Sequence, residues 1–167
     1  MNMSGAKKIL LAAGGTGGHL FPAEALACVL IARGYDVDLV TDARASQYGG
    51  MFDAAHLHIV PSETLRSKSP LALARTAGTL ALGLGKALML MRQLKPALVV
   101  GFGGYPTLPP LYAASLLRVP SIVHDANAVM GRANRALSAR VNAIAPSFPG
   151  ILDQQPALAA KATLTGN

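Results

Sequence analysis

A glycine-rich segment near the start of the chain combines residue types that can hold an anion and move a proton. Gly14-Gly15-Thr16-Gly17-Gly18 follows a short apolar run and precedes His19. Glycines let a ligand approach the backbone, and free amides at a helix start attract negative charge. An imidazole with an ordinary pKa of about 6.5 can accept a proton at neutral pH. We interpret the segment as a phosphate or sugar site with His19 as a general base. The alternatives are a tight turn and a helix cap.

The glycine spacing argues against two common nucleotide motifs. Leu20 stands where the dinucleotide fingerprint needs its third glycine, and the segment lacks the lysine of a P-loop. Gly85-Lys86-Ala87 resembles the end of a P-loop, but it lies in a predicted helix and lacks the Ser or Thr that would hold magnesium. Neither NAD nor a P-loop nucleotide is expected, and no cofactor is predicted.

Two further segments place glycine or polar residues directly after apolar runs. Phe102-Gly103-Gly104-Tyr105-Pro106 allows close backbone approach, or is an ordinary loop. His124-Asp125-Ala126-Asn127 offers acceptors and an amide to sugar hydroxyls, or caps its own loop. Parallel strands end at one edge of a sheet, so we expect both segments to converge with the glycine-rich segment on one site.

The remaining candidate ligands argue against metal and redox chemistry. His56 and His58 share one face of a predicted strand, but no third ligand stands nearby, so no metal site is expected. Cys28 lies in an apolar helical stretch without a disulfide partner, and we predict that it is a small buried apolar residue.

The apolar pattern predicts the elements that position these segments. Short apolar runs alternate with helical stretches and occupy residues 7–13, 37–41, 57–60, 97–102, 121–124 and 141–145. Their nearly continuous apolar character is typical of strands covered on both faces, which predicts an α/β fold with a Rossmann-like, doubly wound parallel sheet. A first helix is predicted from His19 or Pro22 to Arg33, and Ser69 is expected to cap a longer one.

Length, composition and charge narrow the class of protein. The 167 residues, with 51% hydrophobic and 14% charged residues, predict one folded domain. Only five apolar residues follow the N-terminal lysines, too few for a signal peptide, so a cytoplasmic location is expected. The net charge of +7 is concentrated between Glu63 and Asp125, where seven basic residues and no acidic ones occur. This surface suits an anionic membrane or a phosphate-bearing substrate. Nucleic acid is disfavoured because aromatic residues are scarce.

The long helix predicted from Pro70 to about Gln93 is apolar around most of its circumference. Residues 71–91 are numerous enough to span a membrane, but Arg75 and Lys86 argue against that alternative. We instead expect a helix that packs on the sheet and contacts a membrane surface through Arg75, Lys86 and Leu82.

Taken together, these segments resemble the MurG family of GT-B glycosyltransferases. The resemblance covers nearly the whole chain and rests on the three segments with their flanking residues, Phe21-Pro22-Ala23, Gly101 and Gly131-Arg132-Ala133-Asn134. It implies that residues 1–167 form a single N-terminal domain that binds the acceptor and associates with the membrane. The C-terminal donor-binding domain of the family would be absent from this chain.

The resemblance implies inverting transfer of N-acetylglucosamine from UDP-N-acetylglucosamine to the 4-hydroxyl of a lipid-linked N-acetylmuramyl-pentapeptide. This step of peptidoglycan synthesis would take place at the cytoplasmic face of the bacterial inner membrane. His19 would be the base, and the implied substrate contacts are Thr16, Gly17, Gly18 and Asn127, with Gly103, Gly104 and Tyr105 holding the acceptor diphosphate. No metal need bind the protein.

One departure and one alternative accompany the resemblance. The family's usual Glu-Gln pair is here Asp125-Ala126, which keeps a carboxylate and loses an amide. The isolated domain is expected to be inactive. The alternative function is a non-catalytic module that binds the lipid substrate and the membrane and recruits a separate donor-binding partner. A continuation of the reading frame into a second α/β domain would favour the enzyme.

Overall fold

The computed structural model describes residues 6–14, 16–44, 57–63 and 69–166, and they form a six-stranded sheet flanked by helices. The strands are β1 (Lys8–Ala12), β2 (Asp36–Thr41), β3 (Leu57–Ile59), β4 (Leu98–Gly101), β5 (Ser121–Asp125) and β6 (Ala143–Pro146). Their order is β3-β2-β1-β4-β5-β6, and every pairing is parallel. This is the strand order of the Rossmann fold, so the predicted fold class is confirmed. Each predicted run matches a strand to within two residues at either end.

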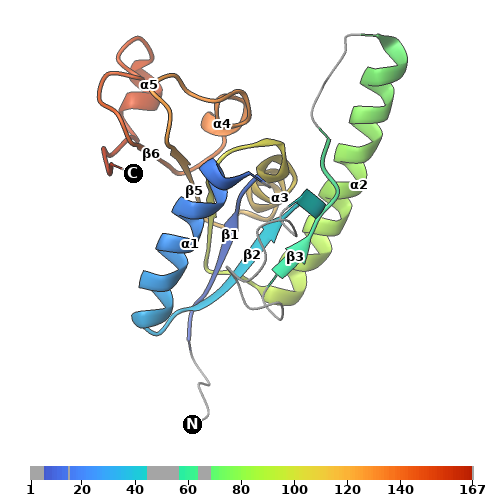
Figure 1. Ribbon diagram of the computed structural model, residues 1–167, viewed down its shortest axis with the longest axis horizontal. Coiled ribbons are helices and arrows are strands. Elements are labelled where there is room, and N and C mark those ends of the chain that lie inside the picture. Colours follow the sequence, from blue (N-terminus) through green and yellow to red (C-terminus); the bar gives the residue numbers. More distant parts are fainter. Residues whose placement is uncertain (1–5, 15, 45–56, 64–68, 167) are drawn as a thin grey trace.

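The helices cover both faces of the sheet. They are α1 (Gly17–Ala32), α2 (Pro70–Leu94), α3 (Leu108–Leu117), α4 (Arg132–Ser138) and α5 (Pro156–Ala159), with a short 3-10 helix, η3 (Tyr105–Thr107). Figure 1 shows α1 on one side of the sheet and α2 with α3 on the other. The predicted cap of α2 is confirmed, because the Ser69 hydroxyl accepts a hydrogen bond from the amide of Ala72 at 3.3 Å.

Side chains of the central strand alternate between two hydrophobic clusters. Leu10 and Ala12 of β1 belong to the larger cluster, which α2 and α3 cover. Ile9, Leu11 and Ala13 belong to the second cluster, beneath α1. Successive residues of a strand point to opposite faces, so a strand covered on both faces must be apolar at consecutive positions. This explains why the strand runs in the sequence show no alternation.

Helix α2 lies against the sheet as predicted. Its buried residues include Gly83, Ala87 and Met91. Gly83 lies so close to Pro61 that an added Cβ atom would be 2.2 Å from the Pro61 carbonyl oxygen. Among the residues that the structure describes, no helix is long and apolar enough to cross a membrane.

The prediction that Cys28 is buried is wrong, because Cys28 is exposed on α1. The buried residues of α1 are Leu20, Ala23 and Ala27, which form one narrow stripe toward the sheet. Apart from His19 and Glu24 the helix is apolar, so its sequence has no continuous polar face to show which side points outward. Cys28 lies just outside the buried stripe.

Candidate functional site

The loops after β1 and β4 meet at the middle of the carboxyl edge of the sheet. These strands are neighbours, and the chain continues from β1 toward β2 on one side and from β4 toward β5 on the other. Ligands of open α/β sheets bind at such switch points. The amide of Gly14 donates a hydrogen bond to the carbonyl oxygen of Gly103 at 2.9 Å. The structure therefore brings the two predicted glycine segments into direct contact.

His19 lies against glycines from both loops. A Cβ atom on Gly14 would be 2.9 Å from Cδ2 of His19, and one on Gly103 would be 3.1 Å from Cε1. A Cβ atom on Gly104 would lie 3.2 Å from Cδ2. Gly103 and Gly104 also have φ angles of 97° and 80°, which favour glycine. These glycines therefore make room for the imidazole, a role that the sequence analysis assigned only to a ligand.

The surroundings of His19 favour its neutral form. Burial lowers the pKa of the imidazole below its ordinary value of 6.5, against the smaller raising effects of the Phe102 carbonyl and the Asp125 carboxylate. Nδ1 of His19 is buried and makes no hydrogen bond within the described residues. Thr16, not His19, is the N-cap residue of α1, so the cap interpretation of His19 is not supported. A neutral imidazole at this position can accept a proton.

The first turn of α1 presents backbone amides close to His19. Thr16 is exposed, and its side chain makes no capping hydrogen bond. An added Cβ atom on Gly18 would meet nothing within 4 Å, so this residue borders open space. Gly17 is different, because a Cβ atom there would be 2.7 Å from the ring of Phe21. The open side of this turn is thus formed by Thr16 and Gly18, and Gly17 also accommodates a packed aromatic ring.

The carboxylate of Asp125 organises the loop after β5. Asp125 is fully buried. Its Oδ1 accepts hydrogen bonds from the backbone amide and the side-chain Nδ2 of Asn127, both at 3.0 Å. Its Oδ2 accepts from the amide of Gly131 at 2.9 Å and from Nδ2 of Asn134 at 3.0 Å. For Asp125 the loop-capping alternative therefore holds. Asn127 itself is exposed on this loop.

His124 and Tyr105, which belong to two of the predicted site segments, have mainly structural contacts. Nε2 of His124 lies 3.1 Å from the carbonyl oxygen of Gly166 and 3.2 Å from the hydroxyl of Ser147. His124 therefore connects β5 to the last described residues. Tyr105 is half-buried at the start of η3 and packs against the larger hydrophobic cluster.

The predicted membrane contacts lie together on the outer side of α2. Leu82 is 72% exposed, and Leu71 and Met89 on the same side are 82% and 64% exposed. The side chain of Arg75 is 77% exposed and lies 3.3 Å from the carboxylate of Glu63. The exposure of Leu71 and Met89 could not be predicted from the sequence, because a helix with apolar residues on most sides does not reveal which ones face outward.

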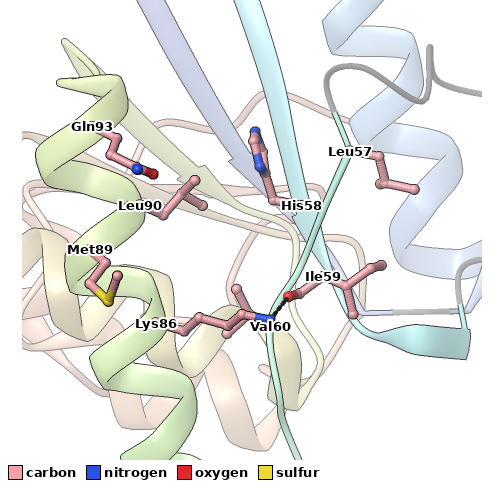
Figure 2. A pocket seen from close by; sticks show the side chains of 8 residues that line it. All are labelled: Leu57, His58, Ile59, Val60, Lys86, Met89, Leu90 and Gln93. Carbon is pink, nitrogen blue, oxygen red and sulfur yellow. Dashed lines mark hydrogen bonds between the residues drawn. The ribbon is translucent and has the colours of Figure 1, made fainter.

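A groove of about 370 Å³ lies between α2 and the edge strand β3. Figure 2 shows Met89 and Leu90 of the helix on one side and Ile59 of the strand on the other. Nζ of Lys86 reaches across and donates a hydrogen bond to the carbonyl oxygen of Ile59 at 3.2 Å. Lys86 therefore fastens α2 to the sheet edge as well as adding positive charge to this surface.

His58 in this groove is bound by a carboxylate. Its Nε2 lies 2.6 Å from Oδ1 of Asp38, whose Oδ2 accepts a hydrogen bond from Lys8 at 2.6 Å. Burial raises the pKa of Asp38, but the hydrogen bonds from Lys8 and His58 outweigh it and hold this pKa below its ordinary value. Within the described part of the chain, no group of three or more His, Cys, Asp or Glu residues could hold a metal. His56 lies outside the described residues.

Comparison with known sequences identifies close relatives. The model of the glycosyltransferase family 28 N-terminal domain matches residues 9–146. A protein of Rhodopseudomonas palustris (strain BisA53) is 65% identical over 98% of this chain and 44% of its own length. A protein of Bradyrhizobium sp. (strain ORS 278) is 66% identical over 98% of this chain and 45% of its own length. Both are named UDP-N-acetylglucosamine--N-acetylmuramyl-(pentapeptide) pyrophosphoryl-undecaprenol N-acetylglucosamine transferase. The chain spans less than half the length of these relatives.

Comparison with solved structures agrees with the sequence relatives. The crystal structure of MurG from Acinetobacter baumannii has a TM-score of 0.67 and 29% identity, over 86% of this chain and 42% of that one. A UDP complex of MnaA from S. aureus has a TM-score of 0.73 at 16% identity, over 96% and 44% of the two chains, and so shares the fold. The predicted fold, the N-terminal half of a GT-B glycosyltransferase, is confirmed. The chain belongs to the glycosyltransferase family 28 N-terminal domain family, as its three converging segments indicated.

Proposed function

We propose that this chain is the acceptor-binding half of an inverting N-acetylglucosamine transferase of peptidoglycan synthesis. The donor is UDP-N-acetylglucosamine, and the acceptor is an undecaprenyl-diphosphate-linked N-acetylmuramyl-pentapeptide, as the names of the relatives indicate. The observation that supports this most strongly is the position of His19, whose imidazole lies at the switch point between two glycine loops with its pKa lowered. A C-terminal domain of the same protein supplies the donor site.

In the proposed reaction His19 acts as a general base. Its ring takes the proton of the acceptor 4-hydroxyl as that oxygen attacks the anomeric carbon of the donor. The bond from that carbon to the UDP oxygen breaks with its electron pair, so UDP leaves and the configuration inverts. The lowered pKa of His19 keeps the base unprotonated before the reaction.

The loops around His19 hold the substrates in this proposal. Thr16, Gly17, Gly18 and Asn127 contact substrate across the cleft, while Gly103, Gly104 and Tyr105 hold the acceptor diphosphate. Support comes from the uncapped first turn of α1, where backbone amides and the helix dipole favour a negatively charged group.

Turnover by the full-length protein tests the proposed function. We expect that it transfers labelled N-acetylglucosamine from UDP-N-acetylglucosamine to the lipid-linked acceptor, with one UDP released for each sugar transferred. The 167-residue chain alone should bind the acceptor without turnover. UDP release that does not depend on the acceptor, or epimerisation of the donor, would contradict the assignment.

We further propose that the outer side of α2 docks on the cytoplasmic face of the bacterial inner membrane as a peripheral contact. Leu71, Leu82 and Met89 are exposed there, and Arg75 and Lys86 border them. Exposed apolar side chains enter the headgroup region, and each basic residue near an anionic surface contributes about 1 kcal/mol. This position brings the site to the lipid-linked acceptor.

Vesicle flotation tests the membrane contact. The double variant Arg75→Glu/Lys86→Glu is expected to bind vesicles with anionic lipid at least about tenfold more weakly than the unmodified chain, because attraction becomes repulsion. Binding of the unmodified chain should weaken as salt screens the charges. The matched control, Lys7→Glu/Arg33→Glu, changes the net charge equally at exposed positions outside α2 and outside the basic segment between Glu63 and Asp125. Equal flotation of the two double variants would refute the assignment.

A further inference from the structure

Two side chains beside Gly103 each carry a buried polar atom without a partner. Nδ1 of His19 and Oδ1 of Asn134 are both buried, and neither makes a hydrogen bond within the described residues. The position that a Cβ atom of Gly103 would occupy is 3.3 Å from Nδ1 of His19 and 3.5 Å from Nδ2 of Asn134. Buried polar atoms are nearly always paired, so two unpaired ones beside the same glycine call for an explanation.

The orientation of the Asn134 side chain follows from its other contacts. Nδ2 donates hydrogen bonds to the carbonyl oxygen of His124 at 2.9 Å and to Oδ2 of Asp125 at 3.0 Å. A carbonyl and a carboxylate can only accept, so the amide cannot be turned around without losing both bonds. Oδ1 is therefore a fixed acceptor, and Asn134 is only 2% exposed.

The chemistry of the two atoms is complementary in one tautomer of His19. A neutral imidazole carries its proton on either Nδ1 or Nε2, and the nitrogen without the proton is the base. If Nδ1 carries the proton, it is a buried donor, and Oδ1 of the neighbouring Asn134 amide is a buried acceptor that lacks a donor. If Nε2 carries the proton, Nδ1 and Oδ1 are both unpaired acceptors, which costs more free energy.

We propose that Asn134 is a positioning residue that holds the His19 proton on Nδ1 through one bridging water, so that Nε2 is the base. This inference rests on the proposed function for its role in catalysis. One buried water can satisfy a donor and an acceptor together, and the two side chains border the same position, which lies 3.3 Å from Nδ1 of His19 and 3.5 Å from the amide nitrogen of Asn134. When Nε2 takes the acceptor proton, the imidazolium keeps its Nδ1 proton directed toward Asn134.

The backbone carbonyl of Phe102 is a second group that can influence the protonation of His19, because it raises the pKa of the imidazole. Asn134 does not touch Phe102 in any hydrogen bond of the described residues, so the two influences can be separated by substitution. If the carbonyl alone determined the tautomer, a change at Asn134 would leave the imidazole unaffected.

Nitrogen NMR of the chain labelled with ¹⁵N-histidine tests the tautomer directly. We expect His19 in the unmodified chain to show a protonated Nδ1 and an unprotonated Nε2, with its signals identified by their loss in His19→Gln. In Asn134→Leu the proton should move to Nε2. Asn142→Leu is the matched control, because it also removes a side-chain amide bound to β5, one whose Oδ1 accepts a hydrogen bond from the amide of Ser121 at the opposite end of that strand.

Either of two results would overturn the inference. One is a protonated Nε2 in the unmodified chain, a measurement that requires no substitution and so does not depend on whether Asn134→Leu folds. The other is an unchanged tautomer in a folded Asn134→Leu variant, which would assign the role to the Phe102 carbonyl. Because no turnover is involved, the NMR result is independent of the proposed function.

The catalytic consequence is measured separately in the full-length protein. Asn134→Leu is expected to lower kcat about 10- to 100-fold, part of the 10²–10⁴ that a general base contributes, with the KM for the donor unchanged. A purely structural defect would instead reduce the amount of folded enzyme without changing the pH dependence of the remaining activity. An unchanged kcat together with the expected tautomer change would refute the catalytic role of Asn134.

Discussion

Replacing His19 with alanine in the full-length protein is expected to lower kcat by about 10²- to 10⁴-fold, the usual contribution of a general base. The KM for UDP-N-acetylglucosamine should change little, because the imidazole acts on the acceptor proton and holds no donor group. Single-turnover measurement with saturating donor and acceptor isolates the chemical step from product release.

A second histidine provides the control for this substitution. His58 is bound to Asp38 on the far side of β2 from α1, in the groove beside α2. His58→Ala also removes an imidazole and should leave the chemical rate unchanged. Circular dichroism establishes that both variants are folded. Equal single-turnover rates for His19→Ala and the unmodified enzyme would remove His19 from the mechanism.

The pH dependence of the unmodified enzyme supplies an independent check on the same residue. Burial lowers the pKa of His19, so a lower pH than usual is needed to protonate the base and stop the reaction. The acidic limb of kcat/KM, which reports groups of the free enzyme, should therefore lie below pH 6.5, the ordinary histidine value. This limb should be absent from the residual activity of His19→Ala. A limb above pH 6.5 would contradict a base whose pKa is governed by burial.

The strands and their common edge could be predicted from the sequence because both depend on local patterns. A strand covered on both faces is a short, nearly continuous apolar run, and the residues after it must leave the sheet at its carboxyl edge. The segments that contain His19, Gly103 and Asn127 could thus be placed on one edge. The pairing of β1 with β4 could not, because it joins residues that are distant in the sequence.

The contacts made by individual glycines and polar residues also could not be predicted, because they join residues that are distant in the sequence. Gly14 and Gly103 come from different strands, yet both make room for His19. Asp125 looked like a ligand for sugar, but its oxygens are bound by donors that lie up to nine residues further along the chain. A residue type shows which bonds it can make, and only the fold shows which of them are already used within the protein. Cys28 was misplaced because α1 has no continuous polar face that would mark its outer side.

Asp125→Ala is expected to be among the most destabilising single substitutions near the site. The carboxylate is fully buried and accepts four hydrogen bonds, from Asn127, Gly131 and Asn134. Hydrogen bonds to charged groups contribute about 1.5–3 kcal/mol each but do not add fully, so we expect a loss of roughly 3–5 kcal/mol in the free energy of unfolding. For a chain of this length each kcal/mol corresponds to about 2–4 °C in Tm.

Two further variants separate the charge of this carboxylate from its shape. Asp125→Asn keeps the shape but turns an amide group toward other donors, either the amide of Gly131 and Nδ2 of Asn134 or the two donors of Asn127. It should therefore be almost as destabilising as Asp125→Ala in urea unfolding. Asp153→Ala removes an exposed aspartate and should change the stability by less than about 0.5 kcal/mol. If Asp125→Asn were as stable as the unmodified chain, the loop would be held by packing and not by an acceptor-only carboxylate. Asn127 would then be held in place by other contacts.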